Sequence, residues 1–280
     1  MHTLFFFQTA VKRLEAAGVA AAENDARLLF EHILQAPRYI WPGELDGDQQ
    51  QLIEEMVTRR CNREPLAYIL GKMWFYGLEL KAEPGVFCVR PETETLVETA
   101  LNWGSSESKT AENLEALDLC SGSGAIALAL QANLPNWQVT GLEQSSTALG
   151  NAQENAEKLG LPVRFEQGDA TVVNPQWRSK MSLVVSNPPY IPPRTLPAET
   201  TYEPAAALWG FGEDGMEIPA KIIEVAWEYL LPGGLFLMEH DDIQGEATVA
   251  IARKLGFSEV QTRVDLNNRD RFLYARKPQN

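Results

Sequence analysis

The spacing of apolar residues changes along the chain. Near its start they recur every three or four positions over residues 11–19, 26–33 and 52–57, and breaks at Pro37, Pro42-Gly43 and Asp46-Gly47 separate the three stretches. Such spacing places the apolar side chains on one face of a helix. Residues 1–72 are therefore predicted to form a small helical domain.

A β-hairpin is predicted next. Residues 73–80 and 86–89 are rich in aromatic and branched side chains, and residues 81–85 between them have turn composition. This hairpin is expected to link two domains, over residues 73–90.

The rest of the chain alternates strand-like and helix-like segments, and residues 91–280 are predicted to form a second domain. Its first helix is expected near Pro91, which suits a first helical turn, and the polar residues 104–113 are expected to be an exposed loop. Apolar runs predict strands at 117–119, 139–142, 163–165, 183–185 and, after a Pro-Gly-Gly segment, 235–238. Helices are expected at 125–131, 145–160 and 220–230. This alternation predicts an α/β fold, a mostly parallel sheet with helices on both faces.

A glycine-rich segment follows the first of these strands. Cys120-Ser121-Gly122-Ser123-Gly124 leads into a helix, and glycine lets backbone approach a ligand at a helix N-terminus. The same spacing also serves plain tight turns. Glu143 favours a binding role, because it ends the next strand about 20 residues later, where an acid binds ribose hydroxyls in nucleotide-binding α/β folds. Gly168-Asp169, after the third strand, fits either a ligand contact or a simple turn.

Asn187-Pro188-Pro189-Tyr190 follows the apolar residues 183–185, so it lies where a buried strand leaves the sheet. The prolines stiffen the backbone, and the Asn187 side chain and the carbonyls of Asn187 and Pro188 are hydrogen-bond acceptors. Acceptors beside an aromatic ring suit a planar NH2 group, held by both hydrogens against the ring. Because ligands bind beyond the carboxyl ends of such strands, this segment and the glycine-rich loop are expected to face one crevice.

Composition narrows the possible partners. The 280 residues carry a net charge of −14, with a pI near 4.7, which argues against nucleic acid as the main partner. Arg59, Arg60 and Arg63 fit either a solvated helix face or a local basic patch. No apolar run approaches the roughly 20 residues of a membrane span, so a cytoplasmic protein is expected. The three cysteines and three histidines are too scattered to predict disulfides or a metal site.

Further motifs accompany the two strand-end segments. They are Arg63-Glu64-Pro65-Leu66, Tyr68-Ile69-Leu70-Gly71, Phe75-Tyr76-Gly77, Arg90-Pro91-Glu92-Thr93-Glu94, Glu203-Pro204, Glu213-Asp214-Gly215 and Asp270-Arg271. With them the chain resembles the class I methyltransferases that modify amino groups conjugated to flat π-systems. More narrowly, from about Arg63 to Arg271 it resembles the release-factor glutamine methyltransferases, the HemK/PrmC family. DNA adenine methyltransferases share only the Asn-Pro-Pro-Tyr motif.

The resemblance implies a Rossmann-like, seven-stranded sheet and methyl transfer from S-adenosylmethionine to the side-chain amide nitrogen of the glutamine in the Gly-Gly-Gln loop of peptide release factors. It implies that the N-terminal helices help to dock the release factor, and a monomer is expected. The implied catalytic residues are Asn187, Pro188 and Tyr190. The implied cofactor-binding residues are Phe87, Cys120, Ser121, Gly122, Ser123, Gly124, Glu143, Asp169, Ala170 and Asn187. The implied substrate-binding residues are Arg90, Glu92, Asn187, Pro188, Pro189 and Tyr190.

Several positions depart from the family pattern, and other functions stay open. Cys120-Ser121 stands where Gly-Thr is usual, Glu143 replaces an aspartate, Ala205 stands where an arginine commonly follows the proline, and Glu239-His240-Asp241 lacks the usual glycine. The alternatives are a glutamine methyltransferase acting on a ribosomal protein and an amino methyltransferase acting on nucleic acid. A dinucleotide-dependent oxidoreductase or a non-catalytic nucleotide-binding module would also tolerate the glycine-rich loop, but it gives Tyr190 no role.

Overall fold

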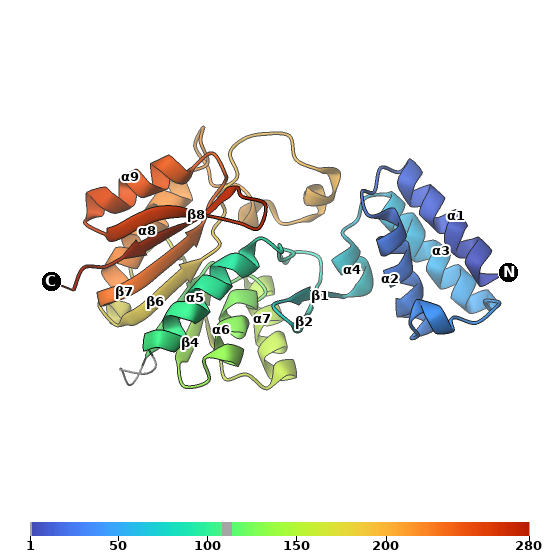
Figure 1. The fold of residues 1–280 in the computed structure, drawn as a ribbon, viewed down its shortest axis with the longest axis horizontal. Helices are drawn as coiled ribbons and strands as arrows, with labels where there is room; N and C mark the ends of the chain where they lie inside the picture. The colour runs from blue at the N-terminus through green and yellow to red at the C-terminus, as the bar shows by residue number, and fades with distance from the viewer. Residues whose placement is uncertain (1, 108–113, 280) are drawn as a thin grey trace. The chain divides into compact units, whose positions relative to one another are not determined.

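A computed structural model describes residues 2–107 and 114–279 of the chain. The chain forms two compact units, and Figure 1 labels most of their helices and strands. The first unit comprises the chain up to Lys72, together with Ala82–Pro84 and Leu196–Tyr202. The second comprises Met73–Lys81, Gly85–Thr195 and the chain from Glu203 onward.

The first unit is helical, as its apolar spacing predicts. Its helices are α1 (Thr3–Ala16), α2 (Ala22–Leu34), α3 (Gly47–Cys61) and α4 (Leu66–Leu70), with a 3-10 turn, η1, at Arg38–Ile40. Helix α3 begins where it does because Asp46 caps it, accepting a hydrogen bond from the Gln49 backbone N–H at 2.8 Å while the Gln49 side chain accepts one from the Asp46 N–H. Leu14, Phe30 and Ile53 are fully buried between the three longer helices, so the three predicted amphipathic stretches share one core.

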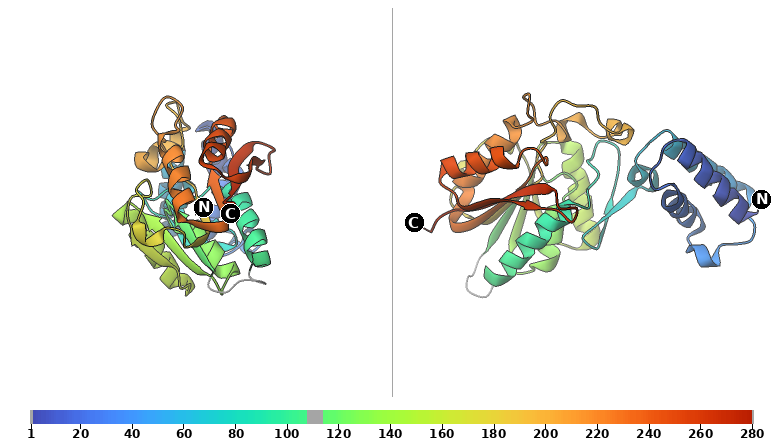
Figure 2. Two further views of the ribbon diagram at one scale, coloured as in Figure 1. Left: turned by 90° about the vertical axis from the view of Figure 1, so that its left-hand side faces the viewer. Right: turned by 45° about the horizontal axis from the view of Figure 1, so that its top comes forward.

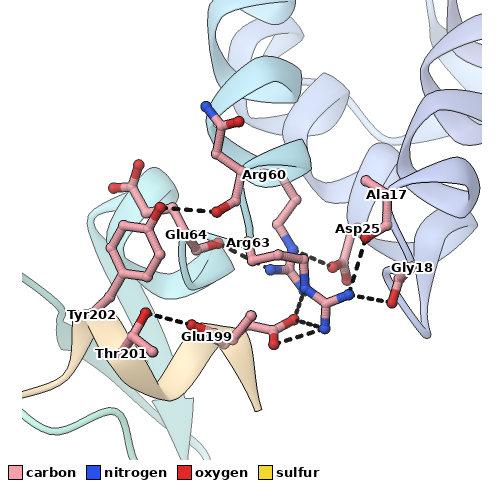
Figure 3. A network of polar contacts seen from close by, with 11 residues as sticks. Ala17, Gly18, Asp25, Arg60, Arg63, Glu64, Glu199, Thr201 and Tyr202 are labelled. Carbon is pink, nitrogen blue, oxygen red and sulfur yellow. Dashed lines mark hydrogen bonds and ion pairs between the residues drawn. The ribbon is translucent and has the colours of Figure 1, made fainter.

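The arginines near the end of α3 do not form an open basic patch. Arg60 is 8% exposed, and its guanidinium donates to Asp25 at 2.9 Å and pairs with Glu199 at 3.3 Å. Arg63 pairs with the same Glu199 at 2.6 Å (Figure 3), and Arg59 pairs with Glu64. Because these cations are matched by carboxylates, the alternative of a local basic patch is wrong.

The same network explains why Leu196–Tyr202, distant in sequence, belongs to the helical unit. Glu199 lies in the 3-10 helix η3 (Ala198–Tyr202) and contacts both Arg60 and Arg63, while the Tyr202 hydroxyl donates to the Asn62 carbonyl at 2.9 Å (Figure 3). Arg60 is buried, so loss of Glu199 would leave part of its charge uncompensated away from water, which is costly. The segment is therefore held in place by charge pairing and one hydrogen bond.

The β-hairpin exists, but its position differs from the prediction. Its strands are β1 (Lys72–Phe75) and β2 (Leu78–Lys81), and residues 86–89 form no strand. Tyr76 and Gly77 have φ angles of 48° and 79°, and two successive positive φ angles are the signature of a tight two-residue hairpin turn. The turn thus falls inside the segment that was predicted to be one continuous strand.

The second unit contains a seven-stranded sheet in the order β5-β4-β3-β6-β7-β9-β8. Its strands are β3 (Glu115–Leu119), β4 (Gln138–Glu143), β5 (Arg164–Gln167), β6 (Met181–Ser186), β7 (Leu230–Glu239), β8 (Ser258–Val264) and β9 (Asp270–Arg276). Neighbours from β5 to β7 pair in parallel, whereas β9 is antiparallel to both β7 and β8. The mostly parallel sheet is confirmed. The strands β8 and β9 were not located from the apolar runs.

Helices cover both faces of this sheet, as expected for a parallel arrangement. They are α5 (Thr93–Glu107), α6 (Ala125–Asn133), α7 (Ser146–Leu159), α8 (Glu217–Tyr229) and α9 (Gly245–Leu255), with 3-10 turns η2 (Pro175–Trp177) and η4 (Ala205–Ala207). The helices α5, α6 and α7 pack on one face and α8 and α9 on the other (Figures 1 and 2). As predicted, α7 is capped by Ser145, whose side chain accepts from the Ala148 N–H, and ends at Gly160 in the left-handed region.

One local prediction in this unit is wrong at its start, the loop expected over residues 104–113. Helix α5 continues to Glu107, so Gly104 is helical, and only residues 108–113 of the predicted loop lie outside the described residues. A Cβ at Gly104 would lie 2.8 Å from Leu134 Cδ1, so glycine is here because the helix packs closely and not because the chain turns. Pro232-Gly233-Gly234, named between the predicted helix and strand, lies within β7, and the register of β7 against β6 shifts over this segment.

Across residues 2–107 and 114–279, no helix is both long enough and apolar enough to cross a membrane.

Candidate active site

The site lies where the order of strands in the sheet reverses. From β3 the chain adds β4 and β5 on one side and then returns to place β6 on the other side. Leu119, at the end of β3, is in register with the residues just before Glu143 and Asn187. Cys120, Glu143 and Asn187 therefore leave the sheet at the same edge, beyond the carboxyl ends of neighbouring strands, which is where open α/β sheets bind ligands.

A cavity of about 470 Å³ opens at this edge, within the roughly 300–1,000 Å³ usual for small-molecule sites. Its lining includes most of the residues that the sequence suggested: Phe87, Cys120, Ser121, Gly122, Ser123, Glu143, Asp169, Ala170, Asn187, Pro188, Pro189 and Tyr190. The expected crevice shared by the glycine-rich loop and Asn187 is thus present. Gly124, Arg90 and Glu92 lie outside the lining.

The glycine-rich loop is held in a tight turn by a buried acid. Cys120, Gly122 and Gly124 have φ angles of 61°, 56° and 80°, a conformation that favours glycine. Asp118 accepts hydrogen bonds from Ser121 Oγ at 2.7 Å and from the Ala127 N–H at 3.2 Å. One carboxyl group therefore ties the loop to the first turn of α6.

Two further acids line the cavity on the β4 and β5 side. Glu143 accepts hydrogen bonds from the backbone N–H groups of Gly122 at 2.8 Å and Ser145 at 2.7 Å, so it joins the loop to the start of α7. Asp169 accepts from the backbone N–H and the hydroxyl of Thr171 at 2.8 and 2.6 Å through a single oxygen, Oδ1. Each carboxylate keeps acceptor capacity toward the cavity, because an ionised carboxylate can accept about four hydrogen bonds.

Asp118 holds its proton more tightly than an ordinary aspartate. Complete burial, opposed by the bonds from Ser121 and Ala127, raises its pKa from 3.8 to about 7. Among the described residues its Oδ1 has no hydrogen-bond partner, and a proton there removes the cost of burying a bare carboxylate.

Replacing Asp118 with asparagine is expected to change how stability depends on pH. Between 3.8 and about 7 the folded wild-type protein keeps this proton while the unfolded chain has lost it, so the Asp118 contribution is complete below 3.8 and is lost as pH rises through 7. The difference in unfolding free energy, variant minus wild type, should rise across this range by on the order of 4 kcal/mol. Urea unfolding of both proteins at several pH values measures it, and a flat difference would contradict the assignment.

Four polar side chains from three different parts of the chain form a connected network beside the cavity. Asn187 Nδ2 donates to Thr93 Oγ1 at 3.3 Å, and the Thr93 hydroxyl donates to Glu239 Oε2 at 2.6 Å. The Tyr190 hydroxyl donates to the other oxygen of Glu239 at 2.8 Å. Glu239 and Thr93 are 1% and 3% exposed, so this network is shielded from bulk water.

Burial sets the protonation of the hydroxyl and thiol groups in the site. It raises the pKa of Tyr190 well above 10, and the nearby charge of Glu239 adds to this effect, so the phenol stays a hydrogen-bond donor. Burial also raises the pKa of the Cys120 thiol, again reinforced by nearby carboxylates. Cys120 is therefore a neutral wall residue and not a thiolate nucleophile.

The backbone after Tyr190 is packed against a second loop. Two backbone hydrogen bonds join the loops, from the Ile191 N–H to the Leu208 carbonyl at 2.8 Å and from the Gly210 N–H to the Ile191 carbonyl at 3.1 Å. Gln244 Nε2 donates to the Tyr190 carbonyl at 2.8 Å. The position of Tyr190 thus depends on a close fit between two loops.

Gly210→Ala is expected to disturb this fit. The added Cβ would lie 1.9 Å from the Gly215 carbonyl oxygen and 2.8 Å from Tyr190 Cα, and such overpacking lowers stability by about 1–3 kcal/mol. Any reaction catalysed in this cavity should slow about tenfold, because small misplacements of a reacting group are costly. Gly150→Ala is the control, since nothing lies within 4 Å of its Cβ in helix α7. Wild-type turnover by the Gly210 variant would refute the expectation.

The structure shows what Arg90 contacts. Its guanidinium pairs with Glu203 at 2.5 Å and lies 4.6 Å above the Phe87 ring, and Glu203 also accepts from the Cys88 N–H at 3.1 Å. Arg90 therefore supports the cavity wall formed by Phe87.

The sequence patterns do not assign Thr93 and Glu239 to the site, although both belong to the network beside the cavity. Thr93 is the fourth residue of the Arg-Pro-Glu-Thr-Glu motif. Glu239 is the last residue of β7, as Glu143 is the last residue of β4. The available signal was an acid at the carboxyl end of a parallel strand.

The chemistry of the cavity fits S-adenosylmethionine. The Glu143 carboxylate suits a pair of ribose hydroxyls, Asp169 suits an amine, and the bend of the glycine-rich loop admits close approach of a ligand to the backbone. Phe87, Leu142 and Ala170 supply apolar wall between these polar groups. The residues present can therefore hold the cofactor without further groups.

Comparison with known proteins places both units in one family. Residues 6–71 match the PrmC N-terminal domain, and residues 110–266 match a methyltransferase domain. A release factor glutamine methyltransferase of Bifidobacterium longum is 38% identical, covering 95% of this chain and 96% of its own length. One of Streptomyces coelicolor is also 38% identical, covering 96% and 95%.

Two solved structures share the fold. A methyltransferase from Pyrococcus furiosus covers 83% of this chain and all of its own, with a TM-score of 0.53 at 18% identity. A 16S rRNA methyltransferase from T. thermophilus, in complex with AdoMet and guanosine, covers 74% of this chain and 49% of its own, with a TM-score of 0.54 at 21% identity.

The strand order, the glycine-rich loop and the acid after β4 define a class I S-adenosylmethionine-dependent methyltransferase. Within that class the likeness to the curated relatives extends over nearly the full length of the chain. The chain belongs to the release factor glutamine methyltransferase family.

Proposed function

We propose that this protein transfers a methyl group from S-adenosylmethionine to the side-chain amide nitrogen of the glutamine in the Gly-Gly-Gln motif of peptide release factors. The observation that carries the proposal is the placement of Asn187, Pro188 and Tyr190 on the wall of the same cavity as the glycine-rich loop and Glu143. The names of the full-length relatives support the same substrate.

Cofactor binding is assigned to one side of the cavity. Cys120, Ser121, Gly122, Ser123 and Gly124 form the loop that would lie along the cofactor. Glu143 would accept from the ribose hydroxyls, and Asp169, Ala170 and Phe87 would hold the base. When bound, S-adenosylmethionine supplies an electrophilic methyl group on a sulfonium that leaves as a neutral thioether.

Substrate binding is assigned to the other side. An amide nitrogen is a weak nucleophile, because its lone pair is delocalised into the carbonyl. The Asn187 side-chain oxygen and the Pro188 carbonyl would each accept one hydrogen of the glutamine NH2, and across the described residues no group donates to either oxygen. Tyr190 would pack against the amide plane, and Pro189 stiffens the turn.

These contacts explain how the protein accelerates the reaction without a strong base. Holding the nitrogen at near-attack distance supplies roughly 7–11 kcal/mol. Acceptors aimed at the positive charge that develops on nitrogen supply about 2.7–4 kcal/mol each, by analogy with oxyanion-hole donors. The methyl group would pass to the amide nitrogen in exchange for its bond to sulfur, and the surplus proton on nitrogen would leave to water.

The helical unit is proposed to dock the release factor, with Arg90 and Glu92 near the bound loop. The monomeric state and the cytoplasmic location stay predictions.

Methyl-labelled S-adenosylmethionine tests the proposal. Label should enter a purified release factor, and should not enter a variant factor whose Gly-Gly-Gln glutamine is replaced. Parallel incubations with ribosomal proteins and with nucleic acid separate the alternatives. Label in either of those alone would overturn the proposal.

A further inference from the structure

The Asn187 amide can present either its oxygen or its NH2 group to the cavity, because rotation about the last side-chain bond exchanges the two. Only the oxygen suits a substrate NH2 group, since an Asn187 NH2 would place donor against donor. The proposed function therefore needs something that fixes the amide in one orientation.

The buried network supplies this selection. Glu239 Oε2 accepts from the Thr93 hydroxyl at 2.6 Å, and this bond uses the single proton of that hydroxyl. With its proton committed, Thr93 Oγ1 can only accept from Asn187, and the group that donates there is Nδ2, at 3.3 Å. The Asn187 oxygen is then left for the cavity.

The position of Glu239 suits this role. Glu239 lies at the end of β7 and is 1% exposed to solvent. It accepts a second hydrogen bond, from the Tyr190 hydroxyl at 2.8 Å, so each of its oxygens has a hydroxyl donor. Burial raises the pKa of the Glu239 carboxyl above its ordinary value and the charge of Glu92 adds to this, whereas the two hydroxyl donors and the charge of Arg271 on β9 act in the opposite direction. The role of Glu239 rests on geometry, since each of its two oxygens accepts from one hydroxyl group. One carboxylate thus orients both the Tyr190 ring and the Asn187 amide.

We infer that Glu239 is a positioning residue whose carboxylate, acting through Thr93, fixes the Asn187 amide with its oxygen toward the substrate nitrogen. The inference rests on the proposed function. It assigns roles to two residues outside the Asn-Pro-Pro-Tyr motif, neither of which needs to touch the reacting atoms.

Glu239→Gln tests it with almost no change of shape. A glutamine has one acceptor oxygen and one donor NH2 group, so it can accept from Tyr190 or from Thr93 but not from both. If its NH2 donates to Thr93, the hydroxyl proton turns to Asn187 and the amide reverses. Turnover should fall about 100-fold, the effect of losing one preorganised group, while affinity for S-adenosylmethionine and the unfolding midpoint stay close to wild type.

Thr93 provides a matched pair of variants. Thr93→Ser keeps the hydroxyl and should keep most of the turnover, whereas Thr93→Val keeps the shape, removes the hydroxyl and should lose as much as Glu239→Gln. Equal losses in the serine and valine variants would mean that packing, not hydrogen-bond direction, is what matters. This pair also decides the question if the Glu239 variant fails to fold.

A double-mutant cycle separates orientation from general damage. If Glu239 acts through Asn187 and the glutamine oxygen still accepts from Tyr190, adding Glu239→Gln to Asn187→Ala should change turnover by no more than about twofold. Fully multiplicative losses, or wild-type turnover in Glu239→Gln, would overturn the inference. Wild-type protein that fails to methylate the release factor would instead refute the proposed function, so the two failures are distinguishable.

Discussion

Asn187→Ala is expected to lower methyl transfer to the release factor by about 10²- to 10³-fold, the cost of removing one preorganised group that contacts developing charge. The side chain follows β6 and lines the cavity, and its only described hydrogen bond is the one that Nδ2 donates to Thr93. Alanine removes the acceptor oxygen without adding bulk. Turnover measured at saturating cofactor and release factor isolates this loss from weaker binding.

Asn102→Ala is the matched control for this substitution. Asn102 is exposed on α5, and alanine has the higher helix propensity, so turnover should be unchanged and stability equal or slightly higher. Asn187→Ala that retained more than a tenth of wild-type turnover would exclude Asn187 as the main acceptor.

Tyr190→Ala is expected to reduce turnover by about 100-fold, because the substrate amide loses the surface that holds it at near-attack distance. Affinity for S-adenosylmethionine should largely survive, since the cofactor is assigned to Glu143, Asp169 and the glycine-rich loop. Equilibrium binding of the cofactor, measured beside turnover, separates the two effects.

Tyr190→Phe divides the role of Tyr190 into its ring and its hydroxyl. The ring remains, but the hydrogen bond to Glu239 at 2.8 Å is lost, and a bond to a charged group is worth about 1.5–3 kcal/mol. An intermediate loss of turnover is expected. If phenylalanine and alanine were equally damaging, the hydroxyl alone would carry the function of Tyr190.

The placement of the cofactor loop could be predicted from the sequence because its signals are local. A short apolar run, then glycines, then a helix-forming stretch specify a strand, a turn and a helix, and Glu143 and Asn187 follow the same kind of run. Parallel strands bring their carboxyl ends to one edge, so the shared crevice followed from the strand pattern alone.

Errors arose at residues whose packing or charge pairing involves a residue far away in the sequence. The residues around Gly104 have the composition of a loop, yet Gly104 lies in helix α5 and packs closely against Leu134. Arg60 and Arg63 read as surface charges, yet both pair with Glu199, more than 130 positions away. The turn at Tyr76-Gly77 lacks the usual Asn-Gly or Asp-Gly signal.

The sequence by itself determined the α/β class, the N-terminal helical region and the position of the glycine-rich and Asn-Pro-Pro-Tyr segments at strand ends, because these depend on periodicity and on the chemistry of neighbouring residues. Only the tertiary structure decided that Thr93 and Glu239, 146 positions apart, meet at 2.6 Å behind Asn187. Hydrogen-bond direction depends on the partner that a buried group meets, and that partner is set by how β6, β7 and α5 pack together.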